Sequence, residues 1–465
     1  MHFRTCEKRP GRRLELHPAW FMAELSRKIR LAPGDFFMHG QDRRMRRAGL
    51  PGNVCCAAIK LGPGFDVERL KKRIAESSVM DWLARAKIYR PLPIIVPAKW
   101  DAKGHRQEIL FEHNTQNGIA DKPAVLPSVV SRRTLNAETG PGLAFDVVPH
   151  PDGTSHLFLS WNHTHLDARG LDLLLNHLNG DDSAKTTPSA QNLISSKQLG
   201  SDFANIWPSA KIARGSVKWL NESGADPLFS FTPPKRSAAQ CTNFYRVVAF
   251  SAEETARIDA RCQQFNCTFR RSHFYLAASL RAVHKIAVQR GNKDAAYLIP
   301  VPHDTRKRGA NGPIFSNHLS ILFYRIEPKF AGRIGDILGE LSRQMTDQIR
   351  DKFPESCMAA LEMFKPLPLS YYVRQLDKPT RGKMATFCFS DSGETCAGMK
   401  ELCGGQIQDV THLVPSWRPP GFTVVFLRFN NRLSALLSAV DDCVKPAEVD
   451  QIERDVRFAL LEESA

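Results

Sequence analysis

The sequence predicts an α/β protein with mixed sheets, and three observations support that class. Apolar runs of strand length alternate with amphipathic helical patterns along most of the 465 residues. Some connections between strands are too short for the crossover that a parallel pair requires, so the sheets must be mixed. The same order of strand, cap and helix recurs 190 residues further on, from Asn53 to Asn243, which predicts two structurally related halves.

In the first half, we expect an apolar strand at Asn53–Lys60. An amphipathic helix starts at Asp66 after a Gly-Pro-Gly turn, because its apolar residues recur at helical spacing and share one face. A further strand covers Ser155–Asn162, where the pattern becomes continuously apolar, as in a buried strand. The next helix begins at Gly170.

In the second half, a strand at Asn243–Phe250 precedes Ser251 and Glu254, which have the spacing of a capping box. The later elements alternate in type and follow from the same periodicities. We expect helices at Ser272–Arg290, Arg333–Arg350 and Pro446 to about Glu462, and strands at Ala296–Val301, His318–Ile326, Met384–Phe389, Phe422–Phe429 and Ser434–Val440.

Composition shifts divide the chain into four segments. Polar, turn-rich stretches open and close residues 181–240, which we interpret as a linker between lobes. Trp207, Trp219 and Phe229 lie inside it, so part of this linker is expected to pack on a lobe. The prediction is a basic N-terminal segment at 1–50, an N-terminal lobe at 51–180, and a C-terminal lobe at 241–465.

The overall composition is that of a globular protein in a reducing compartment. Hydrophobic residues make up 42% and charged residues 24% of the chain, which argues against disorder. The 11 cysteines are scattered without a Cys-x-x-Cys pair, so a disulfide framework is not expected. No apolar run approaches the roughly 20 residues that span a bilayer, and no signal-peptide core follows Met1. We therefore expect a cytoplasmic protein with no transmembrane segment.

The net charge of +16 is concentrated at the N-terminus. Residues 1–50 hold 12 Lys/Arg and 5 Asp/Glu, a balance of +7, with the densest cluster at Arg43, Arg44, Arg46 and Arg47. Such a surface attracts polyanions: nucleic acid, anionic lipid, CoA phosphates or an acidic carrier protein. A solvated face without a specific partner is the favoured alternative. No zinc-finger spacing, RNA-recognition motif or basic region with heptads is present, so no specific nucleic acid is expected.

The run from Ser160 to Gly170 carries the most chemical information. His163 stands four residues before Asp167, after an apolar strand and ahead of a helix. A strand-to-helix turn projects side chains from a rigid base, and neutral imidazole suits a general base near neutral pH. The alternative is structural, because either residue can cap the following helix.

This run resembles the active-site motif of the CoA-dependent acyltransferase superfamily, which includes condensation domains and wax-ester/diacylglycerol acyltransferases. Its motif is His-His-x-x-x-Asp-Gly, in which the second His is catalytic. His163 and Asp167 match it, whereas Asn162 and Ala168 replace the first His and the Gly. The resemblance covers roughly residues 50–460. It implies two chloramphenicol-acetyltransferase-like lobes with mixed sheets and flanking helices, and an active site between the lobes.

The resemblance also implies further site residues. The segment from Pro300 to Arg306 looks like the one whose Arg pairs with the motif Asp, which makes Arg306 the expected partner of Asp167. Ser392, with Ser390 as a close alternative, resembles the hydroxyl that serves the oxyanion in the second half. In this family acyl transfer is direct. No Ser or Cys nucleophile is needed, and no Gly-x-Ser-x-Gly elbow is visible.

The implied activity is acyl transfer from a CoA or carrier-protein thioester to a hydroxyl or amine. Its acceptor would be a small molecule or a lipid, the latter reached by peripheral contact with a membrane. The thioester is a co-substrate, and no tightly bound cofactor or metal is expected.

Two other functions stay open. His163, His165 and Asp167 also look like the His-x-His-x-Asp-His zinc motif of metallo-β-lactamase-fold hydrolases, with Ala168 in place of the closing His. Further zinc ligands would have to come from scattered histidines: His177, His273, His284, His303, His318 or His412. A non-catalytic member of the acyltransferase fold is the third possibility, which the Asn162 and Ala168 departures permit.

Overall fold

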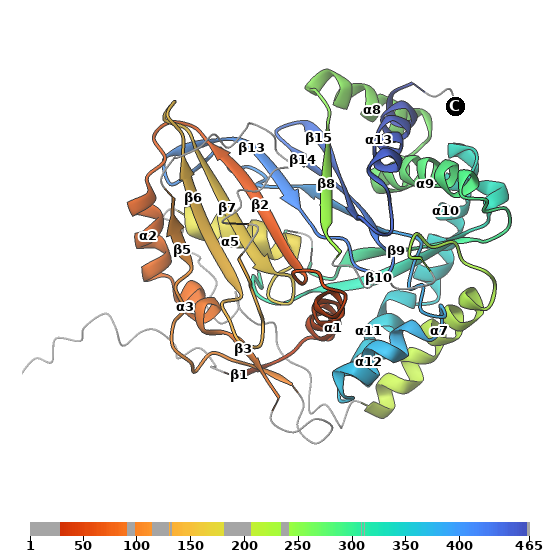
Figure 1. Ribbon diagram of the computed structural model, residues 1–465, viewed down its shortest axis with the longest axis horizontal. Coiled ribbons are helices and arrows are strands. Elements are labelled where there is room, and N and C mark those ends of the chain that lie inside the picture. Colours follow the sequence, from red (N-terminus) through yellow and green to blue (C-terminus); the bar gives the residue numbers. More distant parts are fainter. Residues whose placement is uncertain are drawn as a thin grey trace, which may run out of the picture.

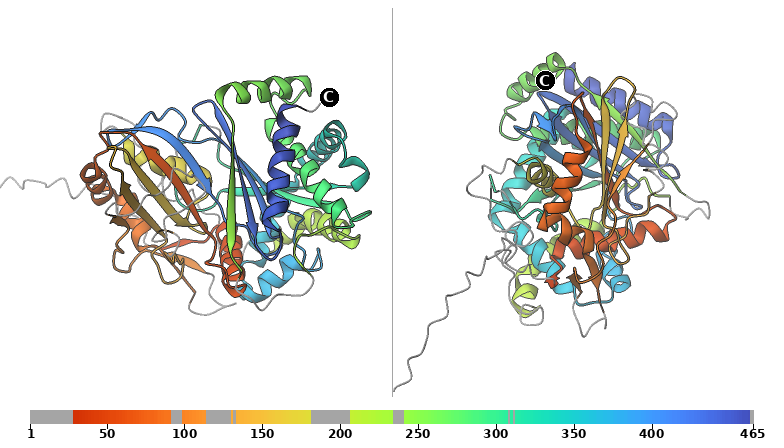
Figure 2. Two further views of the ribbon diagram at one scale, coloured as in Figure 1. Left: turned by 45° about the horizontal axis from the view of Figure 1, so that its top comes forward. Right: turned by 90° about the vertical axis from the view of Figure 1, so that its left-hand side faces the viewer.

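The computed structural model describes residues 28–90, 98–113, 130, 133–180, 206–233, 241–307, 309–310 and 312–462. Two sheets lie side by side, with most of the helices on their outer faces (Figure 1). The two further views show the same arrangement obliquely from above and from the side of the first sheet (Figure 2). The predicted α/β class with mixed sheets is confirmed, because both sheets contain parallel and antiparallel pairs.

The first sheet has six strands in the order β12-β13-β2-β7-β6-β5. Only β5 and β6 pair in parallel. The strands are β2 (Val54–Leu61), β5 (Leu110–Glu112), β6 (Leu143–Pro149), β7 (Ser155–Asn162), β12 (Glu401–Leu402) and β13 (Gly405–Leu413). The helices of this half are α2 (Val67–Glu76), α3 (Ser78–Arg85) and α5 (Ala168–Asn179).

The second sheet has the order β11-β14-β15-β8, and the β9/β10 hairpin runs beside β11. The strands are β8 (Asn243–Ala249), β9 (Tyr297–Asp304), β10 (Leu319–Ile326), β11 (Cys388–Glu394), β14 (Phe422–Phe429) and β15 (Arg432–Val440). The helices are α7 (Ile206–Ala225), α8 (Ala252–Gln264), α9 (Arg271–Gln289), α10 (Ile334–Arg350), α11 (Phe353–Phe364), α12 (Leu369–Asp377) and α13 (Pro446–Leu461), with a 3₁₀ turn at Pro328–Phe330.

The two halves exchange elements. Strand β13 comes from the second half of the chain but pairs with β2, in a register that sets Leu413 opposite Cys56. Helix α1 (Pro33–Arg47) lies between the halves, and a small sheet of β1 (Lys28–Arg30), β4 (Lys99–Asp101) and β3 (Lys87–Tyr89) lies below it in the view (Figure 1). The lobe boundaries at 51–180 and 241–465 stay a prediction about chain segments, and in space β12 and β13 belong to the first sheet.

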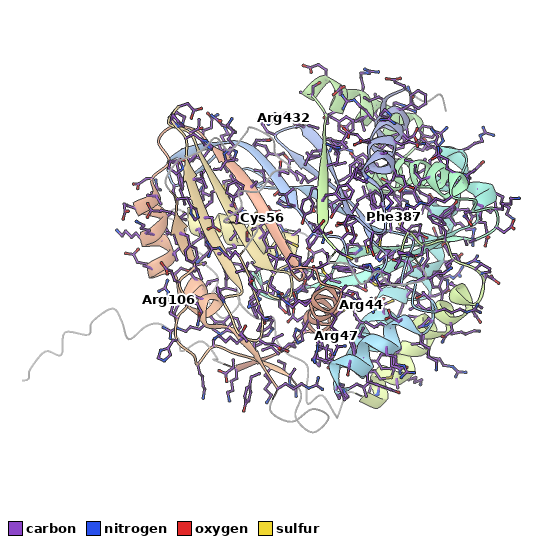
Figure 3. All side chains as sticks on the ribbon, viewed as in Figure 1. Arg44, Arg47, Cys56, Arg106, Phe387 and Arg432 are labelled. Atoms are coloured by element: carbon purple, nitrogen blue, oxygen red, sulfur yellow. The ribbon has the colours of Figure 1, made fainter. Side chains whose placement is uncertain are left out.

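Alternation along β7 explains how the sheets contact each other. Leu157, Leu159 and Trp161 point into the core of the first half. Phe158, on the opposite face, packs in a thin apolar layer with Val425 of β14 and Leu436 of β15. Cys56, labelled in Figure 3, belongs to this layer, whereas Phe387 belongs to the core of the second half. The layer joins the two sheets across the middle of the molecule.

The capping box predicted at Ser251 and Glu254 is confirmed. The Ser251 hydroxyl accepts a hydrogen bond from the Glu254 N–H at 3.1 Å, and the Glu254 carboxylate accepts one from the Ser251 N–H at 2.9 Å.

Two predicted elements begin at other residues than expected. Helix α5 begins at Ala168, capped by Asp167, and not at Gly170. The strand expected at Met384–Phe389 starts only at Cys388, since Met384 has a φ of 63°, which extended backbone does not adopt.

The arginine cluster of the N-terminal segment does not form one basic surface. Arg44 is 7% exposed and pairs with Asp377 of α12 at 2.5 Å, while Arg46 pairs with Asp42 at 2.8 Å. Arg47 is exposed (Figure 3). Two of the four cations therefore neutralise internal carboxylates, which weakens this cluster as a docking site for a polyanion.

The predicted linker contains a folded helix. Helix α7 lies within residues 181–240 and packs on α11, where the Ser216 N–H donates to the Ser356 hydroxyl at 2.8 Å. Residues 181–205 and 234–240 lie outside the described residues. Among the helices that the structure describes, none combines the length and apolarity that crossing a bilayer requires.

The layer between the sheets makes a testable contribution to stability. Phe158 is 3% exposed, so Phe158→Ala is expected to lower the free energy of unfolding by about 3–5 kcal/mol, the usual cost of emptying a buried aromatic site. Phe269, fully exposed at 101%, is the matched control, and Phe269→Ala should leave stability nearly unchanged. Urea denaturation measures both, and equal effects would contradict a packed layer.

Candidate active site

His163 lies in the turn that joins β7 to α5, and hydrogen bonds occupy every backbone polar group of residues 163–165. The His163 N–H donates to the Asn53 carbonyl at 2.8 Å, and the His165 N–H donates to the Asn162 carbonyl at 2.9 Å. The His165 carbonyl accepts from the Ser316 N–H at 2.7 Å. A turn with no free backbone groups has one stable conformation, so it can aim an imidazole accurately.

Two side-chain amides supply the remaining three of these six bonds. The Asn162 oxygen accepts from the Thr164 N–H at 3.0 Å. The Asn317 amide, from the second half of the chain, donates to the carbonyls of His163 and Thr164 at 2.9 and 3.1 Å. The turn is therefore completed only when both halves of the chain are folded.

The environment of His163 favours the neutral imidazole. Its Nδ1 atom is shielded from solvent and has no hydrogen-bond partner among the described residues. Burial lowers the pKa of His163 below that of a free histidine, and the Asp167 carboxylate offsets only part of this effect. The ring is therefore in the form that accepts a proton at neutral pH, as a general base requires.

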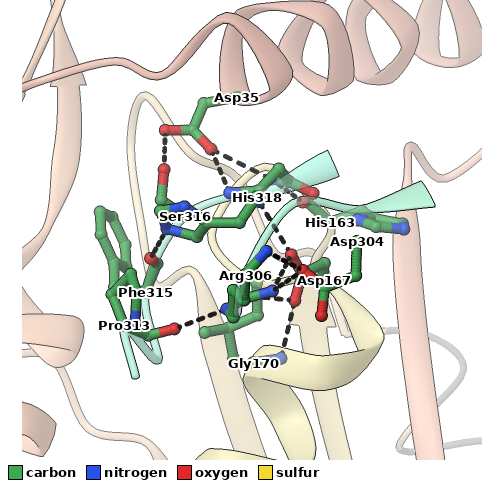
Figure 4. Close-up of polar contacts among 12 residues, drawn as sticks. Asp35, His163, Asp167, Gly170, Asp304, Arg306, Pro313, Phe315, Ser316 and His318 are labelled. Carbon is green, nitrogen blue, oxygen red and sulfur yellow. Dashed lines mark hydrogen bonds and ion pairs between the residues drawn. The ribbon is translucent and has the colours of Figure 1, made fainter. Parts of the chain in front are cut away.

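Asp167 and Arg306 form a bidentate ion pair between the halves (Figure 4). The guanidinium nitrogens lie 2.9 and 3.0 Å from the two carboxylate oxygens, and the side chains are 3% and 11% exposed. Asp167 also accepts from the N–H groups of Gly170 and His318 at 2.7 and 2.9 Å. The structure thus brings together the pair that the resemblance implied, and the four donors occupy both carboxylate oxygens.

The segment 314–318 packs closely against the N-terminal ends of helices α1 and α5. A Cβ on Gly34 of α1 would lie 2.7 Å from the Asn317 carbonyl oxygen, and one on Gly170 of α5 would lie 2.4 Å from that of Ile314. Only glycine permits backbone approach as close as this at both positions. The segment, and with it Asn317, is held against the His163 turn from two sides.

The two departures from the acyltransferase motif have local explanations. Asn162 is fully buried, and its amide oxygen holds the Thr164 N–H. Ala168 is the first residue of α5, where φ is helical and glycine is not needed. Neither replacement disturbs the backbone that carries His163.

The candidate serines lie on β11, in the second half. Ser390 pairs in register with Val425, whose side chain lies in the layer between the sheets, so Ser390 points toward the first sheet. Ser392 falls in the irregularity between Asp391 and Glu394, where the register shifts. The register therefore favours Ser390 over Ser392, and an oxyanion role for either stays a prediction.

The geometry does not suit the alternative zinc site. His165 is buried, packs on Trp100 at 4.7 Å between ring centroids, and has its pKa lowered by burial to about 4. The ligand atoms of His163, His165 and Asp167 do not lie close enough together to hold one metal ion. Among the described residues, the one group of three whose ligand atoms do is Cys241, Asp441 and Asp442.

The other candidate histidines do not complete a zinc site with His163. His303 is exposed, and His318 lies beside the ion pair, where its backbone N–H donates to Asp167 but its ring contacts another group. The ring contacts are those of His177 with Ser77, His273 with Tyr324, His284 with Tyr297, His318 with the Phe315 carbonyl and His412 with Thr395.

Three residues that build the site were not among those predicted from the sequence: Asn317, Asp35 and Asp42. Asp35 and Asp42 are seven residues apart, which sets them on one face of α1, and both are buried. Their helical spacing within a basic segment was the feature of the sequence that could have indicated two buried acids on one helix face.

Solved structures with similar folds cover nearly the whole chain. Trichothecene 15-O-acetyltransferase from Fusarium sporotrichioides is 14% identical with a TM-score of 0.66, covering 93% of this chain and 95% of that one. A starter condensation domain of rhizomide synthetase in complex with C8-CoA is 14% identical, with a TM-score of 0.63 and 94% of each chain covered. The epimerization domain from the third module of tyrocidine synthetase B is 14% identical with a TM-score of 0.62, and the match covers 93% of this chain and 95% of that one.

No protein-family profile matches the chain, and no curated protein matches its sequence. The structural matches define the class of fold: a chloramphenicol-acetyltransferase-like fold, as in the CoA-dependent acyltransferase superfamily. This particular chain has that fold over 93% of its length, with His163 and Asp167 on the strand-to-helix turn. The predicted resemblance and fold class are confirmed.

The ion pair gives a prediction for stability. Arg306→Ala leaves the Asp167 carboxylate buried without its cation, and we expect a loss of about 3–5 kcal/mol in the free energy of unfolding. Arg343→Ala is the control, because that side chain is 59% exposed and its pair with Glu340 is worth under about 1 kcal/mol. Urea denaturation compares them, and similar losses would show that the buried pair has no special role.

Proposed function

We propose that this protein transfers an acyl group from a thioester to a hydroxyl or amine acceptor, with His163 as the general base. The observation that supports this most is a half-buried imidazole, with its Nδ1 atom shielded and its pKa lowered, on a fully hydrogen-bonded turn within a fold shared with acyltransferases. The fold alone does not fix the reaction, since one similar structure is an epimerization domain.

In the proposed reaction, His163 takes the proton from the acceptor as its oxygen or nitrogen attacks the thioester carbonyl. The carbon–sulfur bond then breaks, and the thiolate leaving group takes up that proton. Asp167 and Arg306 hold the turn and the segment 314–318 together and do not touch the reacting atoms. A hydroxyl of Ser390 or Ser392 would stabilise the oxyanion.

The proposed donor is an acyl-CoA or an acyl group on an acidic carrier protein. One similar structure holds C8-CoA, which supports a CoA thioester, and the net charge of +16 would attract either phosphates or an acidic carrier. The proposed acceptor is a small molecule or a lipid, with no tightly bound cofactor. We also propose a cytoplasmic location, because all ten cysteines in the described residues are unpaired.

Thiol release from a panel of acyl-CoAs, with mixed alcohol and amine acceptors, tests the function. His163→Ala is expected to lower the rate roughly 10²- to 10⁴-fold, the usual contribution of a general base, and chelators should have no effect. His105→Ala, on an exposed loop, is the matched control and should retain full activity. A His163→Ala protein that folds and keeps the wild-type rate would exclude the proposed role.

The pH dependence of kcat/KM follows from the lowered pKa of His163. The imidazole acts only when unprotonated, so activity should persist as the pH falls and decline only when it passes the lowered pKa. We therefore expect the acid limb to have its midpoint below about 6.5, the ordinary value for histidine. A pH–rate profile measures this, and a midpoint above 7 would mean that another group limits the reaction.

A further inference from the structure

Helix α1 presents two buried carboxylates to the two amides that hold the His163 turn. Asp35 and Asp42 are 0% and 3% exposed, and seven residues separate them, so they face the same side two turns apart. Neither contacts His163 directly. Each binds an asparagine that also contacts backbone atoms of that turn, and the Asn162 amide donates in addition to the Leu135 carbonyl at 3.3 Å.

Asp42 contacts residues of the first half of the chain, next to the first sheet. Its Oδ1 atom accepts from the Asn162 amide at 3.0 Å and from the Asn53 N–H at 2.8 Å. Asn162 then holds the Thr164 N–H, and the Asn53 carbonyl accepts the His163 N–H. One carboxylate therefore fixes both groups that flank His163 on this side, while Arg46 balances its charge.

Asp35 contacts the segment 314–318 of the second half of the chain (Figure 4). Its Oδ1 atom accepts from the backbone N–H and the side-chain amide of Asn317 at 2.7 and 3.1 Å. Its Oδ2 atom accepts from the Ser316 hydroxyl at 2.5 Å and the Trp100 indole at 3.0 Å. The same Asn317 amide holds the carbonyls of His163 and Thr164.

The Oδ1 atoms of Asp35 and Asp42 each accept a hydrogen bond from a backbone N–H, that of Asn317 and that of Asn53. An oxygen that accepts there cannot donate, so it holds the NH₂ end of each amide toward α1. Burial raises the pKa of Asp35, but this Oδ1 atom accepts in either protonation state. With Asn162 in that orientation, its oxygen faces the Thr164 N–H. With Asn317 in that orientation, its donors face two carbonyls. A neutral amide at position 35 or 42 would permit the opposite orientation. For Asn317 this sets an oxygen against the carbonyls of His163 and Thr164, and for Asn162 it sets the NH₂ group against the Thr164 N–H.

We propose that Asp35 and Asp42 are positioning residues that set the orientation of the His163 imidazole through Asn317 and Asn162. In this chain, the pair of Asn162 with Asp42 supplies the support of the turn on the side where the acyltransferase motif has its first histidine. The catalytic part of this inference rests on the proposed acyl transfer, whereas its structural part concerns the imidazole alone.

The experiment uses the full chain with Asp42→Asn, Asp35→Asn and Asn162→Asp, and the swap of Asn162→Asp with Asp42→Asn. Each single change should lower kcat about 10- to 100-fold, the fold-change that corresponds to losing one hydrogen bond to a charged group. KM should change little, because the altered side chains are buried. The swap restores one carboxylate facing one amide and should recover part of kcat. Asp66→Asn, at the exposed cap of α2, is the matched control.

Histidine titration by NMR gives a second readout that does not depend on activity, with the His163 signal assigned from its absence in His163→Ala. A loosened turn admits water to the ring, so the pKa of His163 should rise toward the ordinary value in each single variant and fall back in the swap. If Asp42→Asn does not fold, Asn162→Ser carries the same test, since it keeps an oxygen for Thr164 and removes the donor to Asp42.

The outcomes separate the two proposals. If His163→Ala abolishes thiol release while the α1 variants keep both kcat and the His163 titration, the positioning role is overturned and the proposed function stands. If the wild type releases no thiol from any acyl-CoA, the titration still decides: an unchanged midpoint overturns the positioning role, and a raised one supports it.

Discussion

The ion pair between Asp167 and Arg306 is the contact on which the site depends, because it joins the two halves of the chain beside His163. Both side chains are almost fully buried, so each would be costly to leave alone, and the bidentate geometry with two further backbone donors offsets that cost. The pair fixes the start of α5 relative to the segment 314–318, and that segment carries Asn317 to the turn.

Around this pair, packing and polarity have separate roles. The apolar layer of Phe158, Val425 and Leu436 joins the sheets but does not determine their exact alignment. Directional contacts do so at the site, where Gly34 and Gly170 let two helices approach the same segment. A general base needs this accuracy, because proton transfer requires the two heavy atoms at hydrogen-bond distance.

The same rigidity explains how the chain tolerates an unusual version of the motif. The turn needs a donor or acceptor for each backbone group and does not require a particular side chain before His163. Asn162 meets the requirement with its oxygen, and a carboxylate on α1 orients the amide. Departures from a family motif are therefore informative about activity only after the contacts of the replacing residue are known.

The α/β class, most strands and helices, and the spacing of His163 and Asp167 on a strand-to-helix turn were predictable from the sequence, because these features depend on contiguous residues and their periodicity. The Arg306 partner came from the resemblance, and the structure sets it beside Asp167. The tertiary fold sets β13 against β2, turns Ser390 toward the first sheet and brings Asp35 and Asp42 to the turn. Those features depend on strand register and on contacts between residues far apart in the chain, and local periodicity carries no information about either.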